Sequence, residues 1–225
     1  MLTAALDTSL GCAFAVKDDD LLLIDNFLAD TGRDNDRRLT LWLMDLLAQK
    51  GLAPRDIAGW TAGIGPGSFA GLRCGIALLK GFCLVSGARL RGLPTPLAIA
   101  AAAPFQTGIV GILNDGRCGQ VILSRVELQK DKPPRLIEPP QPLDPEALAS
   151  PIRTCNAWLT LQADRLPKLP TAIADALVRL DKYSAAPLLD DQLPWPNTRQ
   201  ETEDSTTPIY VRPPVFVSPS PIATP

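Results

Sequence analysis

Hydrophobic residues in the amino-terminal half form short runs and two longer helical stretches. Three apolar runs, separated by polar turns, lie at residues 2–6, 12–16 and 21–28. They predict an antiparallel meander of strands. The next elements that the pattern predicts are a helix at 36–50, a strand at 57–64, a helix at 68–86 and a strand at 89–93. This order of strands and helices predicts an α/β protein whose helices cover a mixed sheet.

The first predicted helix is apolar on two sides. One broad stripe has the spacing expected of a face packed on a sheet, and it consists of Leu39, Trp42, Leu43, Leu46 and Leu47. Leu41, Met44 and Ala48 lie almost opposite that stripe at about 100° per residue. This second face is either buried within the chain or in contact with another protein.

The second predicted helix carries only two charges, Arg73 and Lys80. Gly71 and Gly75 lie one turn apart in it and permit close approach of another backbone. Two such helices side by side would form a surface for a partner protein.

A glycine-rich loop joins the predicted strand at 57–64 to this helix. Its characteristic residues are Gly63, Gly65, Gly67, Ser68 and Gly71. The loop lacks the Gly-Lys-Ser/Thr of a Walker motif, and Ser68 stands where a Rossmann fingerprint needs its third glycine. Two explanations remain: amides at the helix start that receive an anion, or a tight turn with a capping serine.

Proline separates the two halves of the chain. Only five of the 23 prolines come before residue 111, so we expect a loop-rich second half whose end, from about Asp190, is partly extended or disordered except where it docks. The uncharged run 92–114 contains Pro94, Pro96 and Pro104. It therefore predicts a short alanine-rich helix followed by a strand, and not a membrane span.

The amino-acid composition excludes several kinds of catalytic and binding site. With 22 Lys+Arg, 24 Asp+Glu and a net charge of −2, the chain has no basic excess to hold a nucleic acid by itself. Zero histidines remove Ser-His and Cys-His nucleophiles and the HExxH zinc motif, so neither catalytic residues nor a metal site are expected. Five cysteines without a CxxC pair indicate reduced, mostly buried thiols. No basic start precedes the first apolar run, so we expect a cytoplasmic protein.

The loop residues Gly63 to Arg73 resemble the GxGPGSFTGLR signature of the TsaB (YeaZ-like) family, the small subunit of the bacterial machinery that makes threonylcarbamoyladenosine in tRNA. Leu6 to Ser9 resembles the opening IDTS of that family, and residues 37–47 resemble its first interface helix. Asn114 to Val121 is similar to its DARxGEVY segment, and Pro208 to Arg212 to its PxYLR. The resemblance therefore covers nearly the whole chain in the right order.

The resemblance implies an actin-like ATPase or sugar-kinase type α/β fold with two related lobes, a first lobe at 1–103 and a reduced second lobe at 104–225. Such proteins are non-catalytic partners of a larger catalytic paralogue and a small ATPase. Together they modify the adenosine next to the anticodon in tRNAs that read codons starting with A. The resemblance implies that the chain has no cofactor of its own, that it contacts tRNA only through the complex, and that it does not bind a membrane. A nucleotide at the partner interface and a homodimer in the partner's absence are compatible with it.

The resemblance also assigns roles to residues. Asp7, Thr8 and Ser9 match a turn that contacts nucleotide phosphate in the superfamily, and in this family that site is generally degenerate. We expect the partner interface at Leu41, Met44 and Ala48, with Arg73 and Lys80 at its rim.

The sequence departs from the family pattern in three places, and the lost hydroxyl, acid and imidazole groups weaken the case for intrinsic chemistry. Asn35-Asp36 replaces His-Ser, Ala70 replaces Thr, and Gln120 and Ile122 replace Glu and Tyr.

Three alternative functions remain. A glycoprotease-type peptidase would lack its usual histidine ligands. An aspartic peptidase could use Asp30-Thr31-Gly32 in a dimer, although turn residues before a helix also explain this tripeptide. A small ATPase acting through its own cleft would bind ATP with micromolar affinity.

Overall fold

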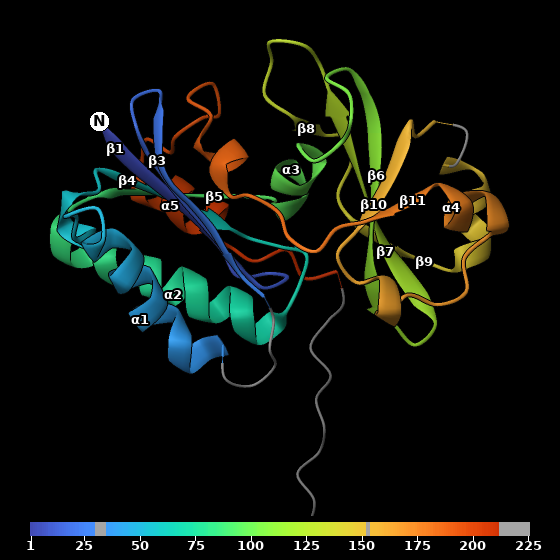
Figure 1. Cartoon of the computed structure of the whole chain (residues 1–225), viewed down its shortest axis with the longest axis horizontal. Helices are drawn as coiled ribbons and strands as arrows, with labels where there is room; N and C mark the ends of the chain where they lie inside the picture. The colour runs from blue at the N-terminus through green and yellow to red at the C-terminus, as the bar shows by residue number, and fades with distance from the viewer. Residues whose placement is uncertain (30–34, 152–153, 212–225) are drawn as a thin grey trace, which may run out of the picture.

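Two β-sheets form the framework of the molecule (Figure 1). The computed structural model describes residues 1–29, 35–151 and 154–211, and for residues 35–37 the backbone alone. The first sheet has the order β3-β2-β1-β4-β5. Its strands are β1 (Leu2–Asp7), β2 (Cys12–Asp18), β3 (Leu21–Leu28), β4 (Gly59–Gly63) and β5 (Arg89–Leu93).

The first sheet is mixed, as predicted. Strands β1, β2 and β3 pair antiparallel, whereas β4 pairs parallel to both β1 and β5. The predicted meander is therefore confirmed. Strand β4 is shorter than the apolar run 57–64 because Ile57 turns into the core before the strand begins at Gly59.

Two long helices, α1 (Asn35–Ala48) and α2 (Phe69–Ser86), lie side by side on one face of this sheet (Figure 1). The inward stripe of α1 is confirmed, since Leu39, Leu43 and Leu47 are buried against Phe14 and Trp60 of the sheet. By length and composition α2 could also cross a membrane. In this structure its buried residues, Leu72, Gly75, Ile76 and Leu79, form the side that faces the sheet.

The second sheet has the order β11-β10-β6-β7-β8, with β9 also paired to β7. Its strands are β6 (Gly108–Arg117), β7 (Gln120–Leu128), β8 (Arg135–Leu136), β9 (Gln141–Leu143), β10 (Ala157–Thr160) and β11 (Leu177–Arg179). Only the hairpin of β6 and β7 is long. The loop-rich half expected from its prolines thus contains a sheet built from one hairpin and several short strands.

The short helix α3 (Thr95–Ala100) packs between the two sheets (Figure 1). All six of its residues are buried. One hydrophobic cluster joins Ala13 and Ala15 of the first sheet to Val110 and Ile112 of the second. The run 92–114 therefore forms the predicted helix and strand at the junction of the two sheets. The far face of the second sheet is covered by the 3-10 helix η2 (Pro145–Ala149) and by α4 (Thr171–Ala176).

After β11 the chain returns to the first sheet. We call residues 183–210 the return segment. It contains the 3-10 helix η5 (Ala186–Leu189), which packs on β1 and β2, and α5 (Arg199–Ser205), which packs on β5. The helix α5 was missed because its residues are polar and surrounded by proline. The division of the chain at residue 103 stays a prediction. By sequence the return segment belongs to the predicted second lobe, but it packs on the first sheet.

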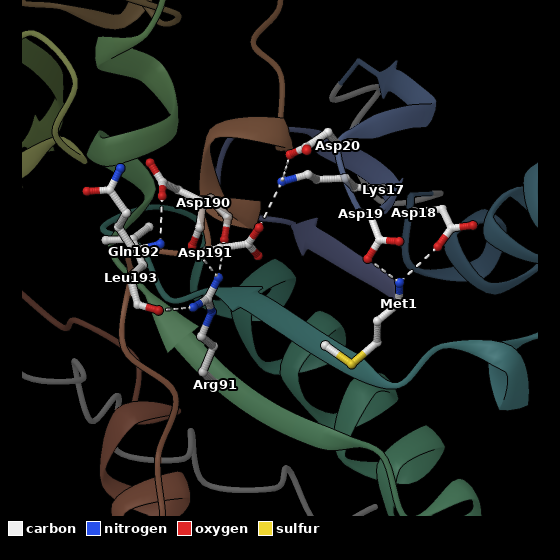
Figure 2. Close-up of polar contacts among 11 residues, drawn as sticks. Met1, Lys17, Asp18, Asp19, Asp20, Arg91, Asp190, Asp191, Gln192 and Leu193 are labelled. Atoms are coloured by element: carbon white, nitrogen blue, oxygen red, sulfur yellow. Dashed lines mark hydrogen bonds and ion pairs between the residues drawn. The ribbon is translucent and has the colours of Figure 1, made fainter.

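Arg91, a buried residue of β5, holds this return segment in place (Figure 2). Its Nε donates to Thr61 Oγ1 over 3.0 Å, and its guanidinium donates to the carbonyl oxygens of Leu188, Asp190 and Leu193. The ring of Trp195 lies 4.2 Å from its guanidinium carbon. Burial lowers the pKa of Arg91 to about 10, so it remains charged at neutral pH. A second link is an ion pair of 3.1 Å between Lys17 and Asp191.

We predict that Arg91→Met destabilises the protein by about 3 kcal/mol or more, because it leaves two buried carbonyl oxygens and a partly buried one without their donor. Arg89→Met is the matched control, since Arg89 lies on the same strand and also stacks on Trp195 but is exposed. It should cost about 1 kcal/mol or less. Denaturant unfolding of both variants measures the difference, and equal losses would contradict the role assigned to Arg91.

Candidate functional site

The Asp7-Thr8-Ser9 turn joins β1 to β2 and is buried throughout. Its polar groups bind within the chain. Thr8 Oγ1 donates to the Gly71 carbonyl oxygen over 2.7 Å, and the Ser68 amide donates to the Ser9 carbonyl oxygen over 2.8 Å. Ser9 Oγ shares a hydrogen bond of 2.7 Å with Thr95 Oγ1 at the start of α3. Thr8 and Ser9 are therefore bonded to other groups of the same chain, and contact of this turn with a phosphate stays a prediction.

Glycines allow the loop and helix α2 to approach this turn so closely. A Cβ at Gly67 would lie 2.5 Å from the Ser9 carbonyl oxygen, and one at Gly71 would overlap the Thr8 carbonyl oxygen. A Cβ at Gly75 would likewise overlap the Thr8 side chain, and a Cβ at Gly63 would overlap the Asp7 side chain. Close packing thus accounts for these four glycines. An anion at the loop stays an untested prediction.

The loop itself has the geometry of a tight turn. Gly65 has a φ of +93°, in the region that favours glycine. Its amide donates to Thr95 Oγ1, and its carbonyl oxygen accepts from the Thr95 amide. Ser68 caps α2 by accepting a hydrogen bond from the Gly71 amide, as predicted. Thr95 was not predicted as part of this arrangement, because a lone threonine after a proline carries no signal in the sequence.

Asp7 is a buried acid with one oxygen unpaired. Its Oδ1 accepts from the Ser9 amide over 2.9 Å, while its Oδ2 has no hydrogen-bond partner among the described residues. Burial, which outweighs its hydrogen bonds, raises the pKa of Asp7. Burial and the nearby Asp7 raise the pKa of Tyr183 well above 10. Burial of a carboxyl group with one oxygen unpaired costs free energy at neutral pH.

We predict that Asp7→Asn stabilises the protein at pH 7 by at least about 1 kcal/mol, because the amide has no charge to bury. The folded pKa is raised, so the group's stabilising contribution is complete below the unfolded value and is lost as pH rises through the folded pKa. The advantage of Asn should therefore be largest at neutral pH and shrink as pH falls toward 3.8.

Thermal melting from about pH 3.5, near the ordinary pKa of Asp, up to about pH 8 checks this difference. Asp164→Asn, at an almost fully exposed carboxylate, serves as the control and should show no such trend. An Asp7→Asn variant less stable than the wild type at pH 7 would show that the charged form is the native one.

We predict that Gly67→Val lowers the free energy of unfolding by about 2 kcal/mol or more, because the new Cβ meets fixed backbone at Ser9. Folding should be disturbed before any ligand binding is. Gly81→Val is the control, since no atom lies within 4 Å of a Cβ there. A Gly67→Val variant that melts like the wild type would show that the loop tolerates side chains.

The predicted partner residues lie on a different part of the first lobe. Leu41 is 69% exposed and Met44 40% exposed, and Ala48 is exposed beside them on α1. Arg73 and Lys80 are exposed on the neighbouring α2. The alternative that the second apolar side of α1 is buried within the chain is therefore wrong for Leu41 and Met44.

Further apolar residues of α2 are exposed on the same side of the sheet, and they were not among the predicted partner residues. They are Phe69, Leu84 and Val85. The low number of charges on α2 was the signal that could have found them. We call the exposed residues Leu41, Met44, Ala48, Phe69, Arg73, Lys80, Leu84 and Val85 the outer helix face.

The remaining sequence predictions fall elsewhere. Asp30-Thr31-Gly32 lies outside the described residues. Within the described part of the chain, no three His, Cys, Asp or Glu side chains are grouped so that they could hold a metal ion. The cysteines are free, but only Cys12 is buried, and Cys118 is exposed in the turn between β6 and β7. The expectation of mostly buried thiols is therefore wrong.

Comparison with known proteins gives consistent results. A family model described as TsaD, tRNA N6-adenosine threonylcarbamoyltransferase, matches residues 29–139. The curated tRNA threonylcarbamoyladenosine biosynthesis protein TsaB of Escherichia coli (strain K12) is 31% identical over 102 residues, which are 44% of this chain and 43% of that protein. The sequence match thus spans less than half of the curated relative.

Solved structures match over nearly the whole chain. YeaZ from Pseudomonas aeruginosa superposes with a TM-score of 0.69 at 22% identity, over 93% of this chain and 99% of that one. A second structure from that organism, described as similar to peptidase YEAZ, gives the same TM-score and identity over 94% and 99%. The predicted actin-like ATPase or sugar-kinase type fold is confirmed. In sequence and fold, the chain is a TsaB/YeaZ-like protein.

Proposed function

We propose that this protein is a non-catalytic partner subunit in the synthesis of threonylcarbamoyladenosine in tRNA. One observation carries the proposal: the turn that would contact a nucleotide phosphate is buried and bonded within the chain, while the outer helix face is exposed and apolar. The similarity to TsaB supplies the pathway. The modified position would be the adenosine next to the anticodon in tRNAs that read codons starting with A.

The Asp7-Thr8-Ser9 geometry supports a non-catalytic role. A phosphate at this turn would have to displace the Thr8–Gly71 and Ser68–Ser9 hydrogen bonds and to lie beside the Asp7 carboxyl group. Both changes cost free energy, because the groups concerned are buried. Accordingly, we propose that a nucleotide, if one is part of the complex, binds at the interface with the partner.

The outer helix face supports a protein partner. Large apolar side chains at this density are typical of an interface core and not of a surface in water. We propose that a larger, TsaD-like paralogue covers this face, that a small ATPase joins the pair, and that tRNA binds only through the complex. Part of this chain matches the TsaD family model, which is consistent with two proteins of related fold. In the partner's absence a second copy of the chain could cover the same face.

Reconstitution tests the proposal. The large paralogue and the small ATPase of the same organism are mixed with tRNA, threonine, bicarbonate and ATP, with and without this protein. We expect modified tRNA only when this protein is present, and neither peptide hydrolysis nor ATP turnover by the protein alone. Modification by the pure protein, or micromolar ATP binding with turnover, would contradict the proposal. Pepstatin-sensitive cleavage would instead revive the aspartic peptidase.

We predict that Met44→Asp weakens binding to the large paralogue by about 3 kcal/mol, because the complex would bury an unpaired carboxylate. The free protein keeps this position in water, so its own stability should change by about 1 kcal/mol or less. Val178→Asp is the control, because Val178 is 45% exposed but lies on β11 of the second sheet.

Calorimetric titration measures the affinity of both variants, and thermal melting at a concentration where the wild type is monomeric measures their stability. Unchanged affinity of Met44→Asp would place the partner elsewhere on the molecule. A large loss of melting temperature in the monomer would mean that Met44 contributes to the core.

A further inference from the structure

Three exposed side chains, two from α2 and one from the end of the return segment, form a cluster at the start of α2. The Arg73 guanidinium carbon lies 3.9 Å from the centre of the Phe69 ring, and Arg73 Nε donates to Tyr210 Oη over 3.1 Å. The Phe69 and Tyr210 rings are 5.1 Å apart. Phe69 is 44% and Tyr210 40% exposed. Two large aromatic side chains and an arginine are thus held together at the surface.

Tyr210 is fixed from beneath by the return segment. The Ile209 amide donates to the Ile64 carbonyl oxygen over 2.8 Å, and the Ile209 side chain packs against the core under α1 and α2. Immediately before it, Thr206 is buried at the end of α5. The position of the Tyr210 hydroxyl group is therefore set by the fold and not by the cluster alone.

Arg73 has no carboxylate partner in the described part of the chain. Arg73 Nε donates its hydrogen bond to Tyr210 Oη. The other two guanidinium nitrogens, Nη1 and Nη2, make no hydrogen bond with any described residue. Lys80, two turns further along the same helix, is likewise exposed and has no ion pair with a described residue. The two cations of the outer helix face thus have no anionic partner among the residues that the structure describes.

We propose that the Arg73, Phe69 and Tyr210 cluster binds a carboxylate of the protein partner at the edge of the outer helix face, with Tyr210 as the positioning residue for Arg73. This inference rests on the proposed function, because it takes the partner surface to be the outer helix face. Arginine, when stacked on aromatic rings, presents its remaining N–H groups in a fixed geometry suited to a carboxylate. Holding Arg73 in advance reduces the side-chain entropy that binding would cost.

The surroundings favour a protein over a nucleic acid as the partner. The cluster lies on α2, which also exposes Leu84 and Val85, beside α1 with its exposed Leu41 and Met44, and the chain carries a net charge of −2. A phosphate backbone would call for further cations in place of these side chains. Interface hot spots, in contrast, are enriched in tyrosine and arginine next to apolar contacts.

Binding to the large paralogue tests the inference through three variants. Arg73→Met should raise the dissociation constant roughly 30-fold and flatten its dependence on salt concentration. Tyr210→Phe removes only the hydroxyl group and should raise it about 3- to 10-fold. The double variant should bind no more weakly than Arg73→Met alone, because Tyr210 acts through Arg73. Arg73→Lys should restore part of the affinity and of the salt dependence.

Controls separate this inference from the proposed function. Arg179→Met removes an exposed arginine of β11 and should leave the affinity unchanged. If Met44→Asp abolishes binding but Arg73→Met and Tyr210→Phe do not change it, the cluster inference is wrong and the partner surface stands. If the wild type does not bind the paralogue, both fail. Loss of tRNA binding by the isolated Arg73→Met variant, with paralogue binding unchanged, would overturn the inference in favour of a nucleic acid.

Discussion

The close approach of helix α2 to the Asp7-Thr8-Ser9 turn is the constraint on which the rest of the first lobe depends. Thr8 binds the carbonyl oxygen of Gly71 and fills the space that a Cβ at Gly75 would need. This contact closes the turn and also fixes which side of α2 faces the sheet. With Leu72, Ile76 and Leu79 turned inward, the residues on the other side of α2 must face outward. The closed Asp7-Thr8-Ser9 turn and the exposed helix face are therefore two results of one packing arrangement.

The return segment couples the end of the chain to this arrangement. Arg91 donates to the carbonyl oxygens of Leu188, Asp190 and Leu193 (Figure 2), and the Ile209 amide joins the segment to Ile64, just after β4. Tyr210 thereby reaches the start of α2 from behind the sheet. The Arg73, Phe69 and Tyr210 cluster at the edge of the proposed partner surface is consequently built from residues about 140 positions apart, and it forms only when both segments have folded.

The sequence predicted the first sheet and its helices well because period-2 and period-3.6 patterns are strong where one face of an element is buried. The inward stripe of α1, the Ser68 cap and the alanine-rich helix before β6 all follow such patterns. The buried Arg91, the helix α5 and the Tyr210 contact could not be predicted. Arg91 donates to carbonyl oxygens about 100 residues away, and α5 packs on the distant strand β5. The residues of α5 are polar, so no hydrophobic pattern marks the helix in the sequence. The glycine loop was located, but only the structure shows which atoms its glycines approach.

Hydrogen exchange of the protein with and without its large paralogue tests the central claim most directly. Amide exchange reports local opening along the chain and so locates a partner without assuming its position. The account predicts slower exchange in residues 38–48 and 69–86 and around Tyr210 when the paralogue is added. It predicts no change at residues 7–9, which are already buried in the free protein. Slower exchange confined to the region between the two sheets, with both outer helices unchanged, would contradict it.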